Sequence, residues 1–243
     1  MDVLVVGAGD VGRWFAGLAD APVAFADVDS ERAEAAADAL GRRSRAVPLD
    51  TEESFGLVVV AVPMGAAVDA IEAHAGRAEQ AVVDFTGEMV APLRAMAETA
   101  PARERVSFHP LFAPEHAPGR IAVSESAPGP ATDHVREWLT AAGNSLVDVA
   151  PDEHDDAMET IQGRAHAAVL AFALAADDVP ETLATPVYSD LADLADRVTS
   201  GNSRVYADIQ DAFDGTEAVA EAAKRLADAD REEFEDAYED AGR

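Results

Sequence analysis

Short apolar runs alternate with amphipathic stretches through the first 150 residues. The apolar runs predict β-strands at Val3–Val6, Val23–Ala26, Ala46–Pro48, Leu57–Val62, Ala81–Phe85, Val106–Phe108, Ile121–Val123 and Leu146–Val149. Apolar residues at helical spacing predict helices between the earlier runs, at Val11–Ala19, Ser30–Leu40, Gly65–His74 and Met89–Thr99. Continuous apolar strands are typical of a parallel sheet buried on both faces. The pattern therefore predicts a Rossmann-type, doubly wound α/β domain over residues 1–150.

The pattern changes after Ala150-Pro151, where apolar residues recur only at helical spacing. We expect helices at Asp152–Asp178, Tyr188–Val198, Val205–Phe213 and from Thr216 to the end. Turn residues stand between the last three, at Gly201-Asn202 and Asp214-Gly215. The sequence therefore predicts an all-helical domain over residues 151–243.

The charge of the chain is strongly unbalanced. Asp and Glu number 47 against 18 Lys and Arg, which gives a net charge of −29, and Lys224 is the single lysine. Nucleic-acid binding needs a basic surface and is not expected. Because the acids alternate with apolar residues at helix and strand periods, we expect a folded protein with a carboxylate-rich surface. Such a surface stays hydrated in multimolar salt, where the Debye length is about 3 Å, and indicates a halophile with a salty cytoplasm.

Several classes of protein are disfavoured by what the sequence lacks. No apolar run has the length of a membrane span, so no membrane partner is expected. The first strand begins at Val3 and leaves no room for a signal peptide, which favours a cytoplasmic location. The chain has no cysteine, and its histidines and carboxylates form no cluster with metal-ligand spacing, so no metal is expected.

A glycine-rich motif follows the first predicted strand and opens a predicted helix. Its sequence is Gly7-Ala8-Gly9-Asp10-Val11-Gly12, the GxGxxG pattern of dinucleotide-binding domains. Gly7 permits the tight turn, Gly9 lets the backbone approach a pyrophosphate, and Gly12 lets helix and strand pack closely. The N–H groups at the start of the helix, at Asp10 and Val11, face the phosphates. In this context the motif predicts a nicotinamide dinucleotide site rather than a turn without a ligand.

An acidic residue follows the second predicted strand, twenty residues after Gly7. The carboxylate of Asp27 suits the ribose hydroxyls and repels a 2′-phosphate, which favours NAD over NADP. Asp29 is close enough to be confused with it, and four nearby arginines could serve a phosphate: Arg32, Arg42, Arg43 and Arg45. Val62-Pro63, after the fourth strand, is expected beside the nicotinamide half, although Pro63 could simply end the strand.

One histidine of six directly follows a predicted core strand. His109 comes after Val106–Phe108, and ligands of open α/β sheets collect at the carboxyl ends of strands. A histidine there can accept a proton from a substrate hydroxyl during hydride transfer, although a lone histidine is more often structural. We expect His74, His116 and His134 at the surface.

Three segments carry a resemblance to a known family. His109-Pro110-Leu111-Phe112-Ala113-Pro114 resembles the HPMFGP segment of prephenate dehydrogenases, and His154–Gln162 is similar to the HDxxMxxIQ start of that family's long helix. The likeness continues through Thr185-Pro186-Val187-Tyr188, Arg197 and Arg204–Ile209, which resemble the SPxY…R…LYADI stretch. With its acidic composition, the chain resembles a halophilic archaeal member of the prephenate dehydrogenase family.

The resemblance implies NAD-dependent oxidative decarboxylation of prephenate to 4-hydroxyphenylpyruvate, a step towards tyrosine. It implies that His109 accepts the proton of the C4 hydroxyl and that Arg197 binds a substrate carboxylate, a task suited to a planar bidentate cation. His166 is expected either in the substrate cleft or in a dimer core. The family resemblance also implies a homodimer built through the helical domain.

One segment departs from the family pattern. Many relatives have a DxxSxK segment whose serine assists the catalytic histidine; here Gly87 stands at the serine position and Met89 at the lysine position. The adjacent Thr86 could offer its hydroxyl instead. We expect His154 to hold the corner between the domains together with Asp155.

Other functions keep the same cofactor domain. An arogenate dehydrogenase differs only in the amine of its substrate, which nothing in the sequence decides. A reductase using NADP or a deazaflavin shares the amino-terminal architecture but has no need of His109 and Arg197 together. A dinucleotide-sensing protein without catalysis is compatible with the missing serine, whereas the retained His109 and Arg197 argue against it.

Overall fold

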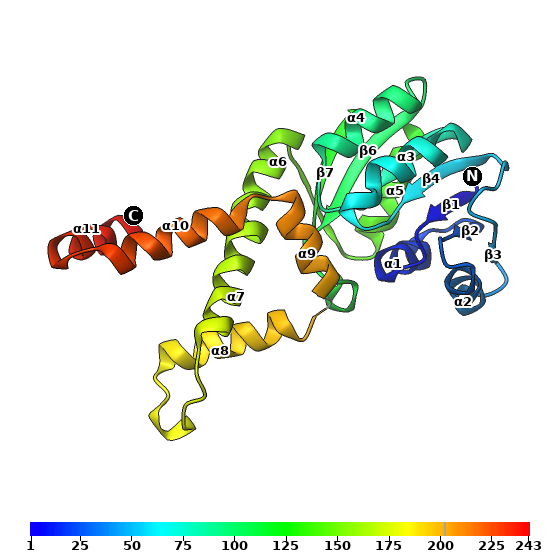
Figure 1. Cartoon of the computed structure of the whole chain (residues 1–243). Helices are drawn as coiled ribbons and strands as arrows, with labels where there is room; N and C mark the ends of the chain where they lie inside the picture. Colours follow the sequence, from blue (N-terminus) through cyan, green and yellow to red (C-terminus); the bar gives the residue numbers. More distant parts are fainter. Residues whose placement is uncertain (202) are drawn as a thin grey trace. The chain divides into compact units, whose positions relative to one another are not determined.

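The chain forms two compact units. The computed structural model describes residues 1–201 and 203–243, so that Asn202, which we expected in a turn with Gly201, lies outside the described residues. The first unit is Met1–Asp155 and the second is Asp156–Arg243 (Figure 1).

An eight-stranded sheet forms the centre of the first unit, in the order β3-β2-β1-β4-β5-β6-β7-β8. The strands are β1 (Val3–Val6), β2 (Val23–Ala26), β3 (Ser44–Ala46), β4 (Phe55–Val60), β5 (Ala78–Asp84), β6 (Glu104–Pro110), β7 (Arg120–Ala127) and β8 (Ser145–Asp148). Neighbouring strands are parallel except at β6–β7, which pair antiparallel. The predicted doubly wound α/β fold is confirmed, with the last two strands reversed.

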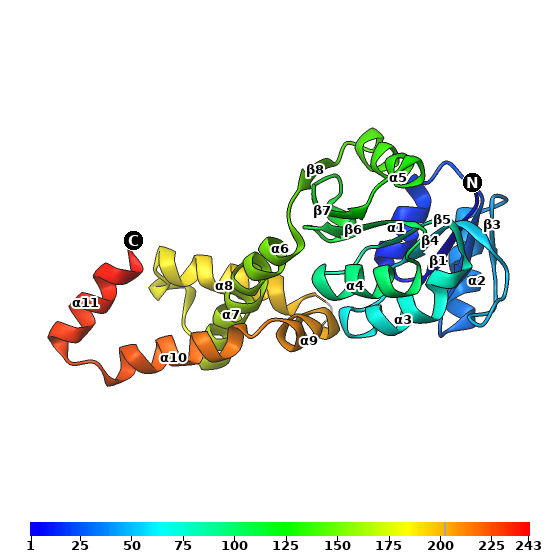
Figure 2. The ribbon, with the colours of Figure 1, turned by 90° about the horizontal axis from the view of Figure 1, so that it is seen from above.

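Helices cover both faces of this sheet, as Figure 2 shows for α5 on one side and α3 and α4 on the other. One face packs against α1 (Asp10–Leu18), α2 (Ser30–Leu40) and α5 (Pro130–Ala141), and the other against α3 (Ala67–His74) and α4 (Val90–Thr99). Strand residues such as Val58 and Val59 are fully buried on opposite faces. Each fully buried side chain of this size contributes about 1.5–3 kcal/mol, so two closed core layers stabilise the unit.

The second unit is helical, as its sequence predicts. It begins within α6 (Pro151–Met158), which continues into a π-helical segment (Glu159–Arg164) and then α7 (Ala165–Ala175). The predicted helix at Asp152–Asp178 is thus a continuous helical path with a π segment inside it. The later helices are α8 (Pro186–Thr199), α9 (Ser203–Ala212), α10 (Gly215–Asp228) and α11 (Arg231–Ala241).

Two details of the second unit have local causes. The single helix expected from Thr216 onward is divided, because Asp230 and Glu233 form a reciprocal capping box that starts α11. The π segment contains Gly163, and a Cβ added at Gly215 would lie 2.2 Å from the Gly163 carbonyl carbon. Glycine at 215 therefore permits the close approach of α10 to the π segment.

Three expectations about the first unit need correction. The strand expected at Leu57–Val62 begins at Phe55 and ends at Val60, and the strand expected at Ala46–Pro48 is Ser44–Ala46. His74, expected at the surface, is buried in the last turn of α3, on the face that also buries Ile71. Burial, together with the charge of Arg77, lowers the pKa of His74.

His116 and His134 are exposed, as expected. Among the described residues, no helix combines the length and the apolar character that crossing a membrane requires.

Candidate active site

The predicted site residues of the first unit follow the carboxyl ends of neighbouring parallel strands. Strand register aligns Val6 with Ala26 and Val60, and Val60 with Asp84. The glycine loop after β1, Asp27 after β2 and His109 near the end of β6 therefore lie along one edge of the sheet (Figure 1). Chain order reverses between β1 and β4, and this switch point is where open α/β sheets bind ligands.

The glycine loop has the close backbone contacts that its sequence predicts. Gly7 has φ +101°, and a Cβ there would lie 2.2 Å from the carbonyl oxygen of Ala61. A Cβ on Gly12 would lie 2.0 Å from the Gly7 carbonyl oxygen. By contrast, nothing lies within 4 Å of a Cβ built on Gly9. The backbone at Gly9 is thus open to a ligand, and a dinucleotide pyrophosphate fits this cradle.

The amino terminus of α1 directly follows the loop. Its N-cap is Gly9, which supplies no side-chain bond to the first N–H groups, and Val11 is half-buried. The exposed carboxylate of Asp10 pairs with Arg13 within the same helix. The N–H groups and dipole of the helix can therefore act on an anion at this end.

Asp27 and Asp29, which the sequence leaves open to confusion, have different roles in the structure. Asp27 Oδ2 accepts the N–H of Ala8 at 2.7 Å and thereby ties the end of β2 to the glycine loop. Asp29 is the N-cap of α2 and accepts the N–H groups of Glu31 and Arg32. Asp27 is therefore the carboxylate at the sheet edge that can accept ribose hydroxyls.

Two of the four candidate phosphate-binding arginines bond to the protein itself. Arg43 donates to backbone carbonyl oxygens at the end of α1, including that of Ala19. Arg45 forms a two-point ion pair with Glu53. Arg32 and Arg42 are exposed. Because Arg43 and Arg45 already bond within the protein, these contacts do not favour binding of the 2′-phosphate of NADP.

Val62 and Pro63 lie just beyond β4. Val62 is half-buried and Pro63 exposed, and the Pro63 carbonyl accepts the N–H of Ala66 to begin a single 3₁₀ turn, Met64–Ala66. Pro63 thus starts a turn three residues after β4 ends at Val60. A nicotinamide contact at Val62-Pro63 stays a prediction.

His109 is buried near the end of β6, with 7% of its surface exposed. Burial and the neighbouring His154 lower the pKa of His109 to about 3. The ring is therefore neutral at pH 7 and holds a lone pair that can accept a proton.

Two further residues complete a chain of polar side chains at His109. His109 Nδ1 lies 2.9 Å from Nε2 of His154, whose Nδ1 lies 2.7 Å from Asp155 Oδ1. The sequence assigns His154 and Asp155 to a corner between domains and misses the contact with His109. The adjacent histidine and aspartate, His154 and Asp155, were a signal of a functional pair in the sequence. Their partner, His109, lies 45 residues before His154 and could not be identified from the local sequence.

Thr86, proposed from sequence as a partner of His109, bonds elsewhere. Its hydroxyl donates to Asp84 Oδ2 at 2.6 Å and also lies 3.0 Å from the Glu88 carbonyl oxygen. A hydroxyl has one proton, so these acceptors already use it. Asp84 is fully buried, and burial raises its pKa to about 7. The catalytic role of Thr86 stays a prediction, and these bonds do not favour it.

Met64 occupies the space beside Gly87. A Cβ built on Gly87 would lie 2.5 Å from Met64 Sδ. A serine at this position would therefore require the methionine side chain to move.

The second unit contains the other two predicted substrate residues. Arg197 lies in the last turn of α8, and its exposed side chain donates weakly to the Asp193 carbonyl oxygen at 3.4 Å. His166 is half-buried, its ring packs edge-on against Tyr206 at 5.0 Å, and burial lowers its pKa. Among the described residues, His166 Nδ1 has no hydrogen-bond partner. Substrate binding by both residues stays a prediction.

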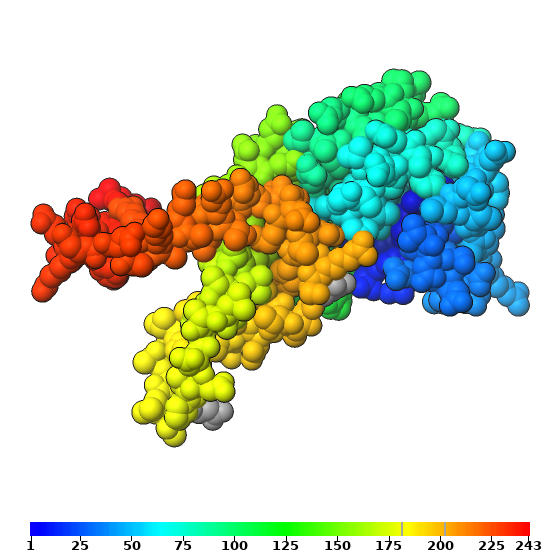
Figure 3. Space-filling model, in the orientation of Figure 1, coloured from blue at the N-terminus to red at the C-terminus, as the bar shows by residue number. Residues whose placement is uncertain are grey.

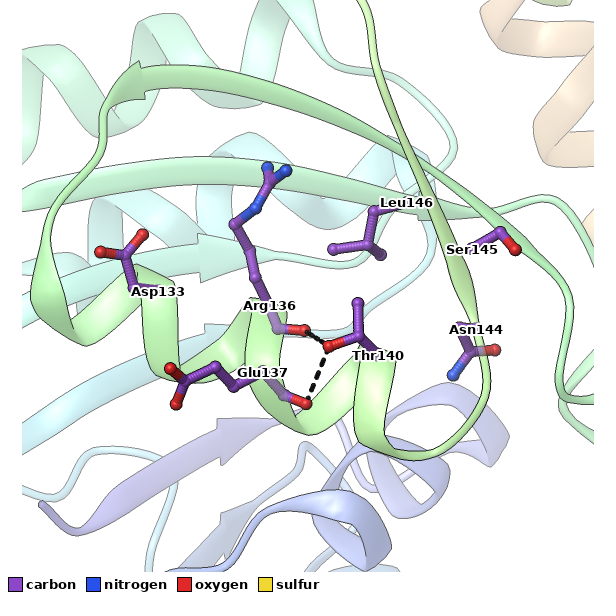
Figure 4. A pocket seen from close by; sticks show the side chains of 7 residues that line it. All are labelled: Asp133, Arg136, Glu137, Thr140, Asn144, Ser145 and Leu146. Carbon is purple, nitrogen blue, oxygen red and sulfur yellow. Dashed lines mark hydrogen bonds between the residues drawn. The ribbon is translucent and has the colours of Figure 1, made fainter.

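An open hollow of 650 Å³ lies beside the last strand of the sheet, between α5 and β8 (Figure 4). Its arginine, Arg136, is already paired with Glu125 and Asp148. The predicted site residues are absent from its lining. Within residues 1–201 and 203–243, no three metal-ligating side chains cluster.

Comparisons with known proteins identify the family of this chain. No protein-family model matches the chain. The 4-amino-4-deoxyprephenate dehydrogenase of Streptomyces pristinaespiralis is 30% identical over 240 residues, which cover 92% of this chain and 81% of the relative.

Two solved structures share the fold. The prephenate dehydrogenase of A. aeolicus, in complex with hydroxyphenyl propionate and NAD⁺, matches with a TM-score of 0.69 at 15% identity and covers 93% of this chain and 88% of its own. The arogenate dehydrogenase of Synechocystis matches with a TM-score of 0.61 at 16% identity and covers 100% and 98%. The Streptomyces relative, similar over nearly the whole length, shows that this chain belongs to the prephenate dehydrogenase family.

Proposed function

We propose that this chain is an NAD-dependent prephenate dehydrogenase, which converts prephenate to 4-hydroxyphenylpyruvate with loss of carbon dioxide. The observation that carries the proposal is the neutral, buried His109 at the sheet edge that also holds the glycine loop. A dehydrogenase of this kind needs a dinucleotide and a base for the substrate hydroxyl. Family membership supports both needs.

The cofactor is assigned to residues of the first unit, with Gly7, Gly9, Asp10, Val11 and Gly12 at the pyrophosphate. Asp27 accepts the ribose hydroxyls, and Val62-Pro63 contacts the nicotinamide half. The open backbone at Gly9 and the engaged side chains of Arg43 and Arg45 support NAD over NADP. When bound, NAD⁺ supplies the acceptor for a hydride.

His109 is assigned the proton transfer. Its neutral ring takes the proton of the C4 hydroxyl while the C4 hydrogen leaves as hydride. The bond from C1 to its carboxylate then breaks, carbon dioxide leaves, and the electron pair makes the ring aromatic. His109 returns the proton to the ring oxygen, so that one prephenate and one NAD⁺ give one hydroxyphenylpyruvate, one carbon dioxide and one NADH.

Arg197 is assigned to a substrate carboxylate, with His166 as a further substrate contact. A dianionic substrate is repelled by a protein of net charge −29 and needs a local cation. The weak bond of Arg197 to a backbone carbonyl leaves its guanidinium exposed for that purpose.

A second candidate substrate is 4-amino-4-deoxyprephenate. The observation in its favour is the 30% identity to the Streptomyces enzyme. An ammonium group at C4 must lose one proton before the hydride can leave, because the arylamine product is neutral, and the same neutral His109 can accept that proton. Arogenate, which differs in the side chain instead, is the third candidate.

The domain roles follow from these assignments: residues 1–150 bind NAD, and residues 151–243 bind substrate and form a homodimer. Large apolar side chains exposed on the second unit support the dimer, among them Leu174 (88% exposed), Leu183 (74%) and Val187 (71%). Figure 3 shows the surface of this segment, from the end of α7 to α8, in yellow. A surface of this kind is normally buried against a partner.

We also infer a cytoplasmic enzyme of a halophilic archaeon, active in tyrosine biosynthesis. The excess of 47 acidic over 18 basic residues supports this origin. Melting the protein at low and high KCl tests it: Tm should rise with salt, and a Tm indifferent to salt contradicts the inference.

The substrate test mixes purified protein with NAD⁺ or NADP⁺ in concentrated KCl and follows absorbance of the reduced nicotinamide. Prephenate, 4-amino-4-deoxyprephenate and arogenate are compared by kcat/KM. We expect the highest kcat/KM with prephenate and NAD⁺. A higher value with the amino compound selects the second candidate, and no turnover with any of the three indicates a sensing protein or another reaction.

A further inference from the structure

Three side chains of the first unit form a buried line that ends at Asp155. His109 and His154 are 7% and 2% exposed, and their rings meet edge-on with centroids 5.1 Å apart. The two hydrogen bonds along the line measure 2.9 Å and 2.7 Å. Both histidines therefore have fixed partners in a place from which water is largely excluded.

Asp155, at the end of this line, accepts hydrogen bonds through both of its carboxylate oxygens. Asp155 Oδ1 accepts the N–H of Met89 at 3.0 Å, and Oδ2 accepts the N–H of Val90 at 3.0 Å, at the amino terminus of α4. Negative charge is favoured at a helix amino terminus. Asp155 is thus a carboxylate that only accepts hydrogen bonds.

With one ring proton on each histidine, the polarity of Asp155 sets the direction of both hydrogen bonds along the line. Nδ1 of His154 must donate to the carboxylate, so Nε2 of a neutral His154 is an acceptor. Nδ1 of His109 must then donate to His154. The lone pair of His109 consequently lies on Nε2, the nitrogen that does not face His154.

We propose that His154 and Asp155 are positioning residues that hold His109 in the tautomer with its lone pair on Nε2. This inference rests on the proposed function, in which His109 accepts the substrate proton. A ring held in the other tautomer presents an N–H where an acceptor is needed.

The same two residues act on the charge that forms during the reaction. When Nε2 takes the substrate proton, His109 becomes a cation whose Nδ1–H bonds to His154. His154 in turn donates to the Asp155 carboxylate, which opposes the new positive charge. The proton returns to the product oxygen, so neither residue is changed at the end of a turnover.

Position 87 has no side-chain hydroxyl that could orient His109. Glycine stands there, and Met64 Sδ would lie 2.5 Å from any Cβ. A hydroxyl-bearing side chain at 87 is therefore excluded unless Met64 moves. His109 is hydrogen-bonded to His154, from α6.

The first test needs no substrate. Nitrogen NMR of the histidine rings, assigned with His109→Asn and His154→Phe, reports which nitrogen of His109 carries the proton. We expect the proton on Nδ1 in the unaltered protein, and a mixture of tautomers in His154→Phe. A proton on Nε2 of His109 in the unaltered protein overturns the proposal, whether or not the variant folds.

The second test separates positioning from packing. His154→Phe keeps the ring volume but removes the acceptor and should lower kcat about 100-fold or more with little change in KM. His154→Gln retains an acceptor oxygen and should recover part of that loss. His74→Phe, at another buried histidine, is the matched control and should keep normal kcat.

The outcomes distinguish this inference from the proposed function. Equal and normal kcat in His154→Phe and His154→Gln overturns the positioning role while the dehydrogenase activity stands. Absence of turnover in the unaltered protein, with the proton found on Nδ1 of His109, overturns the proposed function but not the hydrogen-bonded line.

Discussion

The two units of the chain differ in how completely they bury their apolar residues. In the first unit, both faces of the sheet are covered, and Val58 and Val59 have no exposed surface. In the second unit, α7 is apolar on nearly all sides, yet Leu174 is 88% exposed. Val169, Ala195 and Val198 form only a small core there. The first unit thus closes its own core, whereas the second leaves large apolar side chains exposed.

The candidate site residues differ in the same way. His109 is buried and hydrogen-bonded to His154, whereas Arg197 is exposed and, within the described residues, donates one long hydrogen bond. A base needs a fixed geometry and a tuned pKa, which a closed core supplies. A carboxylate clamp can be ordered by the substrate it binds. This difference agrees with our proposal of acid–base chemistry in the first unit, and of substrate binding and dimer formation in the second.

The largest effect is expected from His109→Asn, which removes the base from the closed unit. We expect kcat to fall by about 100- to 10,000-fold with little change in KM. Steady-state kinetics with prephenate in concentrated KCl measure this, and His116→Asn, at an exposed histidine, is the control. A large rise in KM with normal kcat would mean that His109 binds substrate instead.

The next effect concerns the open surface of the second unit. Leu174→Asp places a charge in the proposed dimer interface and should raise the dimer dissociation constant about 100-fold or more, because an unpaired charge is costly to bury. Sedimentation over a range of protein concentrations measures it. Val28→Asp changes an equally exposed residue of the first unit and should leave association unchanged. A monomer in the unaltered protein removes the contrast between the units.

Arg197→Ala tests the substrate clamp of the second unit. We expect KM for prephenate to rise about 10- to 100-fold and kcat to fall less, because the lost interaction binds ground state and transition state alike. Arg231→Ala, another exposed arginine of this unit, is the control. If kcat alone falls, the roles given to His109 and Arg197 must be exchanged.

The smallest effect is a pH dependence of stability that arises inside the first unit. Burial raises the pKa of Asp84 to about 7, so its contribution to stability is present at low pH and is lost as pH rises towards 7. Burial lowers the pKa of His109 to about 3, so its contribution is lost as pH falls from about 6.5 towards 3. Between about pH 4 and 6.5 the two slopes oppose each other.

Replacing Asp84 or His109 alone should reveal the pH dependence of unfolding free energy that the other residue contributes. Relative to the unaltered protein, Asp84→Asn should lose about 1.4 kcal/mol of unfolding free energy for each pH unit of acidification in this range. His109→Asn should gain about the same amount. Denaturant unfolding at several pH values measures both, and parallel curves for all three proteins would contradict the buried pKa shifts.

Much of the first unit could be predicted because its signals are local. The glycine loop, Asp27 and the runs Val3–Val6 and Val23–Ala26 each stand within a few residues of the features that define them. The spacing of apolar residues therefore located the strands and predicted the fold class. The helix at Pro130–Ala141 was missed although it has local signals, with Pro130 at its first position and Val135 and Leu139 buried four residues apart. The carboxylate of the distant Glu104 accepts its first N–H groups, those of Ala131 and Thr132.

The rest depends on contacts between distant segments. No local pattern links His109 with His154, or Gly87 with Met64, because each pair is brought together by the sheet. The reversal of β7 is likewise decided by pairing with β6 and not by its own period. Sequence thus located His109, and the structure supplied its hydrogen bond to His154.

The most direct test of the central claim follows one hydrogen. Prephenate carrying deuterium at C4 is turned over with NAD⁺ in concentrated KCl, and the reduced cofactor is analysed by mass spectrometry. We predict one deuterium in each NADH, with carbon dioxide and 4-hydroxyphenylpyruvate in equal amounts. Unlabelled NADH, or no NADH with prephenate, would contradict the assignment of this chain as a prephenate dehydrogenase.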